Sequence, residues 1–212
     1  MSVTGAAQPL TFTSPDDGEE LARAEVYGLL AALFQAPPDP GLHAQFQVAV
    51  TEAPVAGAFL EASWGDLVAA ARRIDRAKIE REFDALFLGI GKPEVFLYGS
   101  FYIAGKLNEK PLVALRHDLR ALGIERGEGV VETEDHIASL CEVMRWLIAG
   151  DGAQSGDLPA QRAFFDAHLR AWVESMCDGL QAHPAADFYA ALARFARAFF
   201  AVEAQAFDLL DA

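Results

Sequence analysis

The sequence predicts an all-α protein, folded as a single-domain helical bundle. Apolar residues recur at helical spacing in nearly every long segment, and no segment alternates convincingly with period two. The chain has 212 residues, of which 52% are hydrophobic, and this is enough for one substantial core. No repeat of fixed period indicates a solenoid. We therefore expect a disordered tail at residues 1–17 and one all-helical domain at residues 18–212.

Two helices are predicted before residue 90. The first carries an apolar stripe over residues 26–34 and stops at the proline-rich segment 37–41. The second, at residues 78–88, places four apolar residues on one stripe and is broken by Gly89. Residues 89–105 show no helical periodicity, so we expect an irregular segment with exposed aromatic side chains.

Four further helices are predicted in the rest of the chain. They cover residues 109–122, about 134–148, 160–182 and 186–210, and each has an apolar stripe. Loops are expected at residues 127–131 and 150–156, and the second of these is glycine-containing and flexible.

The composition limits the possible partners. The chain has 31 acidic and 17 basic residues, a formal net charge of -14, so it would repel nucleic acid and anionic membrane surfaces. The first 20 residues contain no basic side chain, which excludes a secretory signal. No apolar run approaches the roughly 20 residues that span a bilayer. We expect a cytoplasmic protein that binds no nucleic acid and does not insert stably into a membrane.

Several kinds of site find no support. Cys141 and Cys177 lack metal-ligand spacing and are expected to be buried thiols. None of the five histidines follows a glutamate by three positions, which excludes a di-iron carboxylate bundle. The two Gly-Lys pairs lack the remaining residues of a phosphate-binding loop, and no Gly-x-Ser-x-Gly elbow occurs. We therefore predict no metal, no cofactor and no catalytic residue.

The segment Glu132-Thr133-Glu134-Asp135-His136 concentrates three carboxylates and an imidazole at a predicted helix start. One interpretation is a helix cap, in which Thr133 is the N-cap and the next two acids occupy the first turn, where the helix dipole favours negative charge. The other is a binding site, in which a carboxylate orients His136 or holds it protonated. Periodicity alone favours the cap.

The aromatic side chains of residues 89–105 also allow two interpretations. Phe96, Tyr98 and Tyr102 either fold back onto the core as part of an ordinary connector or form one wall of a groove for an apolar segment.

Three segments in this order carry a family resemblance: Phe-Asp-Ala-Leu-Phe-Leu-Gly at residues 83–89, Tyr-Gly-Ser-Phe-Tyr at 98–102 and Glu-Thr-Glu-Asp-His-Ile at 132–137. The chain resembles the redox-enzyme maturation chaperones typified by TorD and DmsD, from about Ala24 to Leu210, and this implies a TorD-like helical bundle. Family members usually have prolines where this chain has Phe96-Leu97, and another at Thr133.

The resemblance implies a non-enzymatic chaperone. Such a protein binds the twin-arginine signal peptide and the apo form of a molybdoenzyme catalytic subunit, and holds the subunit back from export until the cofactor is inserted. We hypothesise that the polar end of the peptide site is formed by Glu132, Asp135 and His136. The groove beside it would be lined by Phe83, Leu86, Tyr98, Gly99, Ser100 and Tyr102. A further candidate is Tyr27, on the flank of the first apolar stripe. A leader with two guanidinium groups and an apolar run requires a receptor that combines carboxylates with an apolar groove.

Two alternatives remain open. A related assembly chaperone of the nitrate reductase type would dock on a cytoplasmic apoenzyme without export proofreading. An enzyme that uses Asp135 and His136 as acid and base is disfavoured because no nucleophile or cofactor motif accompanies the pair. The chain is expected to be a monomer or a dimer that exchanges segments through residues 150–156.

Overall fold

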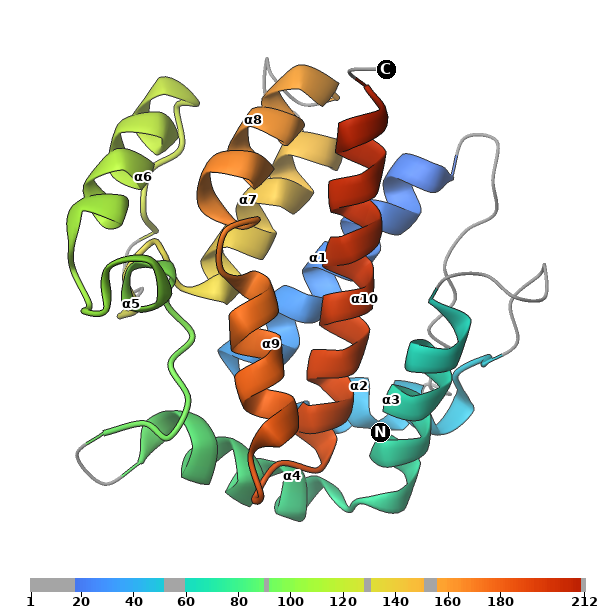
Figure 1. Cartoon of the computed structure of the whole chain (residues 1–212). Helices are drawn as coiled ribbons and strands as arrows, with labels where there is room; N and C mark the ends of the chain where they lie inside the picture. The colour runs from blue at the N-terminus through green and yellow to red at the C-terminus, as the bar shows by residue number, and fades with distance from the viewer. Residues whose placement is uncertain (1–17, 52–59, 90–91, 128–130, 151–155, 211–212) are drawn as a thin grey trace, which may run out of the picture.

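A computed structural model describes residues 18–51, 60–89, 92–127, 131–150 and 156–210. These residues form ten α-helices and one π-helical segment, and the only β pairing among them is one isolated bridge. The buried side chains form one core, so the predicted all-α single-domain bundle is confirmed (Figure 1). The predicted tail at 1–17 and most of the predicted loop at 150–156 lie outside the described residues.

The helices are α1 (Glu19–Gln35), α2 (Pro40–Val48), α3 (Glu61–Arg73), α4 (Arg76–Phe83), α5 (Gly99–Ala104), α6 (Lys110–Ala121), α7 (Ile137–Ala149), α8 (Leu158–His168), α9 (Val173–Ala182) and α10 (Phe188–Leu209). The π-helical segment η1 (Asp84–Leu88) continues α4 without a break. The helices predicted from residues 26–34, 78–88, 109–122 and 186–210 correspond to α1, α4 with η1, α6 and α10.

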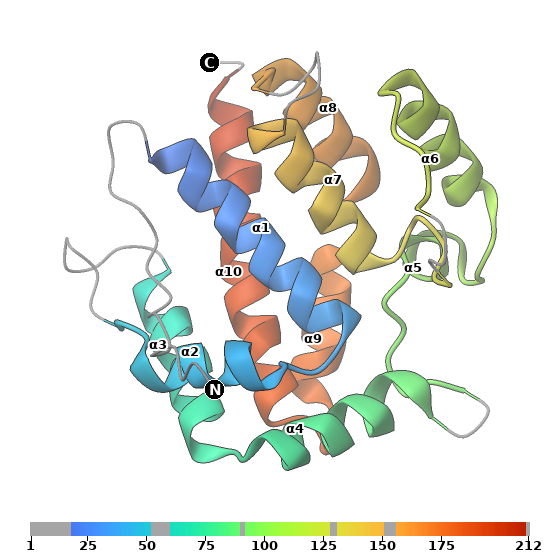
Figure 2. The same cartoon turned by 180° about the vertical axis from the view of Figure 1, so that it is seen from behind.

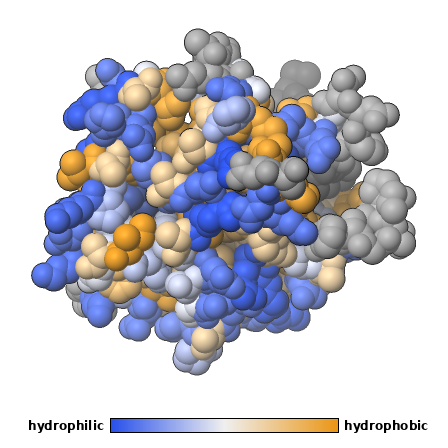
Figure 3. Space-filling model, turned by 45° about the horizontal axis from the view of Figure 1, so that its top comes forward, coloured by the Kyte–Doolittle hydropathy of each residue, from blue (hydrophilic) through white to orange (hydrophobic). Residues whose placement is uncertain are grey.

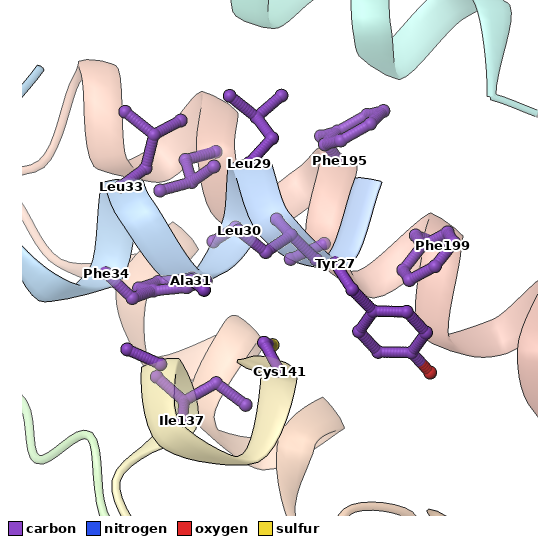
Figure 4. Close-up of a cluster of buried hydrophobic side chains, with 14 of the residues drawn as sticks. Tyr27, Leu29, Leu30, Ala31, Leu33, Phe34, Ile137, Cys141, Phe195 and Phe199 are labelled. Atoms are coloured by element: carbon purple, nitrogen blue, oxygen red, sulfur yellow. The ribbon is translucent and has the colours of Figure 1, made fainter. Parts of the chain in front are cut away.

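Helix α1 packs along α7 and crosses α10 on the face that Figure 2 turns to the viewer (Figures 1 and 2). Figure 4 shows the apolar face of α1 meeting Ile137 and Cys141 of α7 on one side and Phe195 and Phe199 of α10 on the other. The Tyr27 ring meets that of Phe199 edge to face, with centroids 4.8 Å apart. Complete burial of a large apolar side chain contributes about 1.5–3 kcal/mol. The packing of α1 against α7 and α10 therefore supplies much of the stability of the fold.

A buried ion pair joins the N-terminal part of α1 to the C-terminal part of α10. Arg23 donates to both carboxylate oxygens of Glu203, at 2.8 Å each, and Glu203 is only 2% exposed. Tyr27 donates its hydroxyl hydrogen to the same carboxylate at 3.0 Å. Burial and the Glu203 charge raise the pKa of Tyr27 well above its ordinary value, so its hydroxyl stays a donor.

The prediction of one helix over residues 160–182 was wrong, because the chain turns between α8 and α9. The Trp172 side chain is 1% exposed, and its indole N–H donates to the His168 carbonyl at 2.7 Å. This bond satisfies a carbonyl at the end of α8 and fixes the indole in the core. The chain then resumes as α9 at Val173.

Three of the helices, α2, α3 and α5, were not predicted. The proline-rich segment that ends α1 also begins α2, because the Asp39 side chain accepts a hydrogen bond from the Leu42 N–H at 2.7 Å and Pro40 occupies the first turn. Helix α3 follows with Trp64 and Leu67 in the core. The expectation that residues 89–105 are wholly irregular was also wrong, since α5 begins at Gly99.

The surface combines charge with separate apolar patches. On the face shown in Figure 3, apolar residues lie in patches among hydrophilic ones. Both cysteines are buried and free, as predicted. None of the helices in the described ranges is long and apolar enough to cross a membrane.

Candidate functional site

An isolated antiparallel bridge brings two of the sequence motifs together. The Gly99 N–H donates to the Asp135 carbonyl at 2.9 Å, and the Ile137 N–H donates to the Leu97 carbonyl at 2.8 Å, with Tyr98 opposite His136. The segment that opens α5 therefore lies directly beside the segment that opens α7. Six of the predicted site residues meet here: Tyr98, Gly99, Ser100, Glu132, Asp135 and His136.

The buried carboxylate of Asp135 ties both segments together. Its Oδ2 accepts from the Ser100 N–H at 2.9 Å, and its Oδ1 accepts from the Thr133 hydroxyl at 2.6 Å. The side chain of Asp135 is buried, with 3% of the residue exposed. The Thr133 hydroxyl thus donates to Asp135 and does not cap the helix, so the prediction that Thr133 is the N-cap was wrong.

His136 is the N-cap of α7, which begins at Ile137 and not near Glu134. Its Nδ1 accepts from the Ala138 N–H at 3.2 Å, and its ring meets the Tyr98 ring edge to face, with centroids 5.0 Å apart. Burial lowers the pKa of His136 to about 4, against the opposing effect of the Glu132 and Asp135 charges. The imidazole is therefore neutral near pH 7, and the interpretation in which a carboxylate holds it protonated is wrong.

The three carboxylates of the cluster have different partners. Arg116 of α6 donates to both oxygens of Glu134, with its Nε at 3.0 Å from one and its Nη2 at 2.9 Å from the other. Glu132 accepts from the Tyr98 hydroxyl, and burial together with this bond raises the pKa of Tyr98. No cationic side chain of the described residues lies within 4 Å of the Glu132 or Asp135 carboxylate. Among the described residues, Glu134 is thus the one carboxylate of the cluster with a cationic partner.

The aromatic side chains near the bridge pack on one another. The Phe96 and Phe101 rings stack with centroids 4.0 Å apart, and the Tyr102 ring stacks on the Trp172 indole at 5.5 Å. The Tyr102 hydroxyl donates to the Phe96 carbonyl at 2.9 Å, and burial raises the pKa of Tyr102 to about 12. All four rings of residues 96–102 are half-buried, so the segment folds back onto the core while keeping one side exposed.

Gly99 allows the start of α5 to approach this core. A Cβ atom at Gly99 would lie 3.0 Å from the Trp172 Nε1 and 3.1 Å from its Cε2. Real Cβ atoms rarely approach a neighbour so closely, and the indole is fixed by its bond to His168. The close contact explains glycine at this position.

Three of the predicted site residues lie in the core instead. Phe83 packs on Phe87 and on Tyr189 of α10, with centroids 5.1 and 5.7 Å away. Leu86 and Tyr27 have no exposed surface. The Leu86 carbonyl accepts from the N–H groups of residues 94 and 95, at 3.0 Å each, and so anchors the segment that leads to the bridge.

A pocket of about 280 Å³ lies beside the bridge, between α5, α6, α7 and α8. Ser100 and Asp135 line one part of it, and Asp118 of α6 and His168 of α8 also line it. The His168 Nε2 lies 2.9 Å from the Asp118 Oδ2. Sequence reasoning missed this pair, because the two residues are 50 positions apart and neither stands in a motif. No group of metal-ligating side chains occurs in the part of the chain that the structure describes.

Comparison with known proteins gives concordant matches. The family model described as nitrate reductase delta subunit matches residues 56–178, a range that includes the bridge and the whole pocket lining. The chain is 28% identical over 204 residues to the chaperone protein TorD of Vibrio cholerae serotype O1, El Tor Inaba strain, with 89% of this chain and 93% of that protein covered. The TorD protein of the Classical Ogawa strain is 29% identical over the same coverage.

Proposed function

Because this chain belongs to the nitrate reductase delta subunit family of TorD-like chaperones, we propose that it binds the twin-arginine signal peptide of an apo molybdoenzyme subunit. By holding this leader it keeps the subunit from export until the molybdenum cofactor is inserted. The family consists of maturation chaperones for redox enzymes and not of enzymes. We place this step in the cytoplasm, before export.

The observation that carries the proposal is the pair of carboxylates Glu132 and Asp135, which no cationic side chain of the described residues approaches within 4 Å. Asp135 is buried and receives hydrogen bonds from neutral groups only, while Glu132 lies nearby and is half-buried. A buried carboxylate is costly unless it is paired, and a guanidinium is the side chain that pairs with it best. This local chemistry supports a basic ligand for an acidic chaperone.

The aromatic segment supports a second contact. The half-buried rings of residues 96–102 adjoin Glu132 through Tyr98, so an apolar run that follows two arginines has a surface beside the acidic cluster. Exposed arginine–carboxylate pairs contribute only about 0.2–1 kcal/mol each. Burial of roughly 400 Å² of apolar surface gives on the order of 10 kcal/mol before the peptide is ordered. Affinity therefore comes mainly from the apolar run, and the carboxylates set its register.

Calorimetry with a synthetic leader peptide tests the proposal. We expect the peptide to bind, the same peptide with both arginines changed to alanine to bind at least about tenfold more weakly, and Asp135→Asn to weaken only the arginine-containing peptide. Asparagine keeps an acceptor for the Ser100 N–H, which preserves the local fold. Equal affinity for the two peptides would overturn the proposal.

A second candidate is docking on a cytoplasmic apoenzyme without a twin-arginine leader. The observation in its favour is the family description, which refers to a nitrate reductase subunit. A pull-down of full-length apoenzyme separates the two functions, because only leader recognition is lost when both leader arginines become alanine.

A further inference from the structure

The pocket beside the bridge has one polar side and one apolar side. Its polar residues are Ser100, Asp118, Asp135 and His168, and its apolar residues include Ile103 and Ala114. The volume of about 280 Å³ lies just below the roughly 300–1,000 Å³ typical of pockets for whole small molecules. The pocket is therefore of a size for one long side chain.

The hydroxyl of Ser100 has no hydrogen-bond partner among the described residues, although Ser100 is 0% exposed and lines this pocket. A buried polar atom without a partner costs about 1–3 kcal/mol, and nearly all such atoms in proteins are satisfied by protein, water or ligand. An incoming N–H donor would satisfy this oxygen.

Asp135 makes no ion pair with any of the described residues. Its two oxygens accept from the Ser100 N–H and the Thr133 hydroxyl, and each oxygen keeps a lone pair. The nearby guanidinium of Arg116 is engaged by both oxygens of Glu134. A cation that entered the pocket would meet a carboxylate that has no ion pair with the residues the structure describes.

Asp118 places a second carboxylate on the α6 side of the same pocket. Its Oδ2 accepts from the His168 Nε2 at 2.9 Å, and its Oδ1 lies 3.2 Å from the His117 Nδ1. Burial lowers the pKa of His168, although the Asp118 hydrogen bond opposes this. The His168 hydrogen bond holds the Asp118 carboxylate in place at the pocket, and no arginine or lysine of the described residues pairs with that carboxylate.

We propose that this pocket receives one guanidinium group of the arginine pair, held between Asp135 and Asp118 with the Ser100 hydroxyl as a third acceptor. The inference rests on the proposed function and deepens it, since it assigns one of the two arginines to this partly open pocket. A guanidinium presents five donors in a planar fork and suits two carboxylates, which a point-like ammonium does not. The methylene stem would lie on Ile103 and Ala114.

The test is calorimetry on the full chain with four leader peptides that carry Arg-Arg, Lys-Arg, Arg-Lys and Ala-Ala. We expect lysine to weaken binding at one of the two positions only, because one arginine enters the pocket. Asp118→Asn should weaken the Arg-Arg peptide at least about tenfold and remove the difference between the Lys-Arg and Arg-Lys peptides.

Two further variants keep the test decisive. Asp178→Asn removes the same charge from the exposed surface of α9 and should change affinity by less than about twofold. Ser100→Ala should weaken the Arg-Arg peptide without unfolding the chain, since it deletes a hydroxyl that bonds to none of the described residues.

The outcomes separate the two proposals. If the Arg-Arg peptide binds better than the Ala-Ala peptide but Asp118→Asn and Ser100→Ala behave like Asp178→Asn, the pocket assignment is wrong and leader binding stands. If lysine weakens binding equally at both positions, the single-arginine pocket is also wrong. If the wild-type chain binds no leader, both proposals fail.

Discussion

The carboxylate of Glu82 on α4 accepts a hydrogen bond of 2.7 Å from the backbone N–H of Tyr189 on α10. It also accepts from the N–H groups of Asp187 and Phe188, at 2.8 and 3.1 Å. The residue at the N-cap of α10, Asp187, makes no side-chain cap bond of its own. A residue more than 100 positions upstream thus caps the longest helix of the described chain.

We expect Glu82→Ala to lower the free energy of unfolding by about 1–2 kcal/mol, the usual cost of a lost N-cap, because three helix N–H groups lose their acceptor. Urea denaturation measures this change. The matched control is Glu80→Ala, on the same helix, which removes only an exposed pair with Arg76 and should cost about 0.5 kcal/mol. Equal losses in both variants would contradict capping by Glu82.

Gly99→Ala should destabilise the fold and weaken leader binding. The new methyl group would press on the buried Trp172 indole, and overpacking of this kind typically costs about 1–3 kcal/mol. Thermal unfolding and peptide calorimetry measure the two effects. Gly65→Ala in α3 is the control, since its Cβ would meet no atom within 4 Å, and it should stabilise the helix by roughly 0.5–1 kcal/mol.

Ser100→Ala should raise the free energy of unfolding, by about 1 kcal/mol, because the buried hydroxyl that is lost has no partner. Ser63→Ala should act in the opposite direction, since the Ser63 hydroxyl donates to the Leu60 carbonyl at 3.1 Å. Denaturant unfolding of both variants decides the sign. A loss of stability in Ser100→Ala would show that its hydroxyl is satisfied in solution.

Glu203→Ala should cost about 3 kcal/mol or more, because it leaves the half-buried Arg23 guanidinium and the Tyr27 hydroxyl without their shared acceptor. The control is Glu20→Ala, which removes the exposed partner of the same arginine and should change stability by no more than about 1 kcal/mol. Melting temperatures measured side by side compare the two. Similar shifts would mean that the Arg23–Glu203 pair contributes no more than a surface pair.

Stability should fall as the pH falls from about 6.5 towards 4, through His136. Its folded pKa of about 4 lies below the ordinary value of 6.5, so the unfolded chain binds the extra proton in this window. The loss should reach roughly 2 kcal/mol at about pH 5. His136→Asn keeps a side chain that can cap α7 but does not titrate, so urea unfolding at about pH 7.5 and 5 should show a smaller pH-dependent loss in the variant. The same loss in both proteins would exclude His136 as its origin.

The parts of the fold that the sequence predicts are those fixed by local pattern. Helices α1, α6 and α10 follow from apolar periodicity and from the residues that stop them. The break between α8 and α9 does not, because it depends on where the Trp172 indole is buried. The start of α7 was misplaced for a similar reason, since Thr133 bonds to Asp135 and leaves the capping to His136.

The candidate site also contains some residues that the sequence identifies and others that it does not. Motif spacing and family resemblance identified Ser100 and Asp135, which the bridge brings into contact. The buried positions of Phe83 and Leu86 follow from packing against distant segments, which no local pattern reveals. Asp118 and His168 carried no signal at all, because a pair of this kind exists only once α6 and α8 are placed.

Because of the bridge between residues 97–99 and 135–137, the two sides of the pocket are held in different ways. Backbone hydrogen bonds join the two motif segments to each other whatever side chains they carry, whereas α6 contributes the lining residues Ala114, Leu115 and Asp118 from outside the bridge. Substitutions along α6 can therefore change one wall of the pocket without touching the backbone bonds that hold the opposite wall. We expect relatives that bind different partner proteins to differ in sequence first along α6, while the two bridged segments keep their sequence.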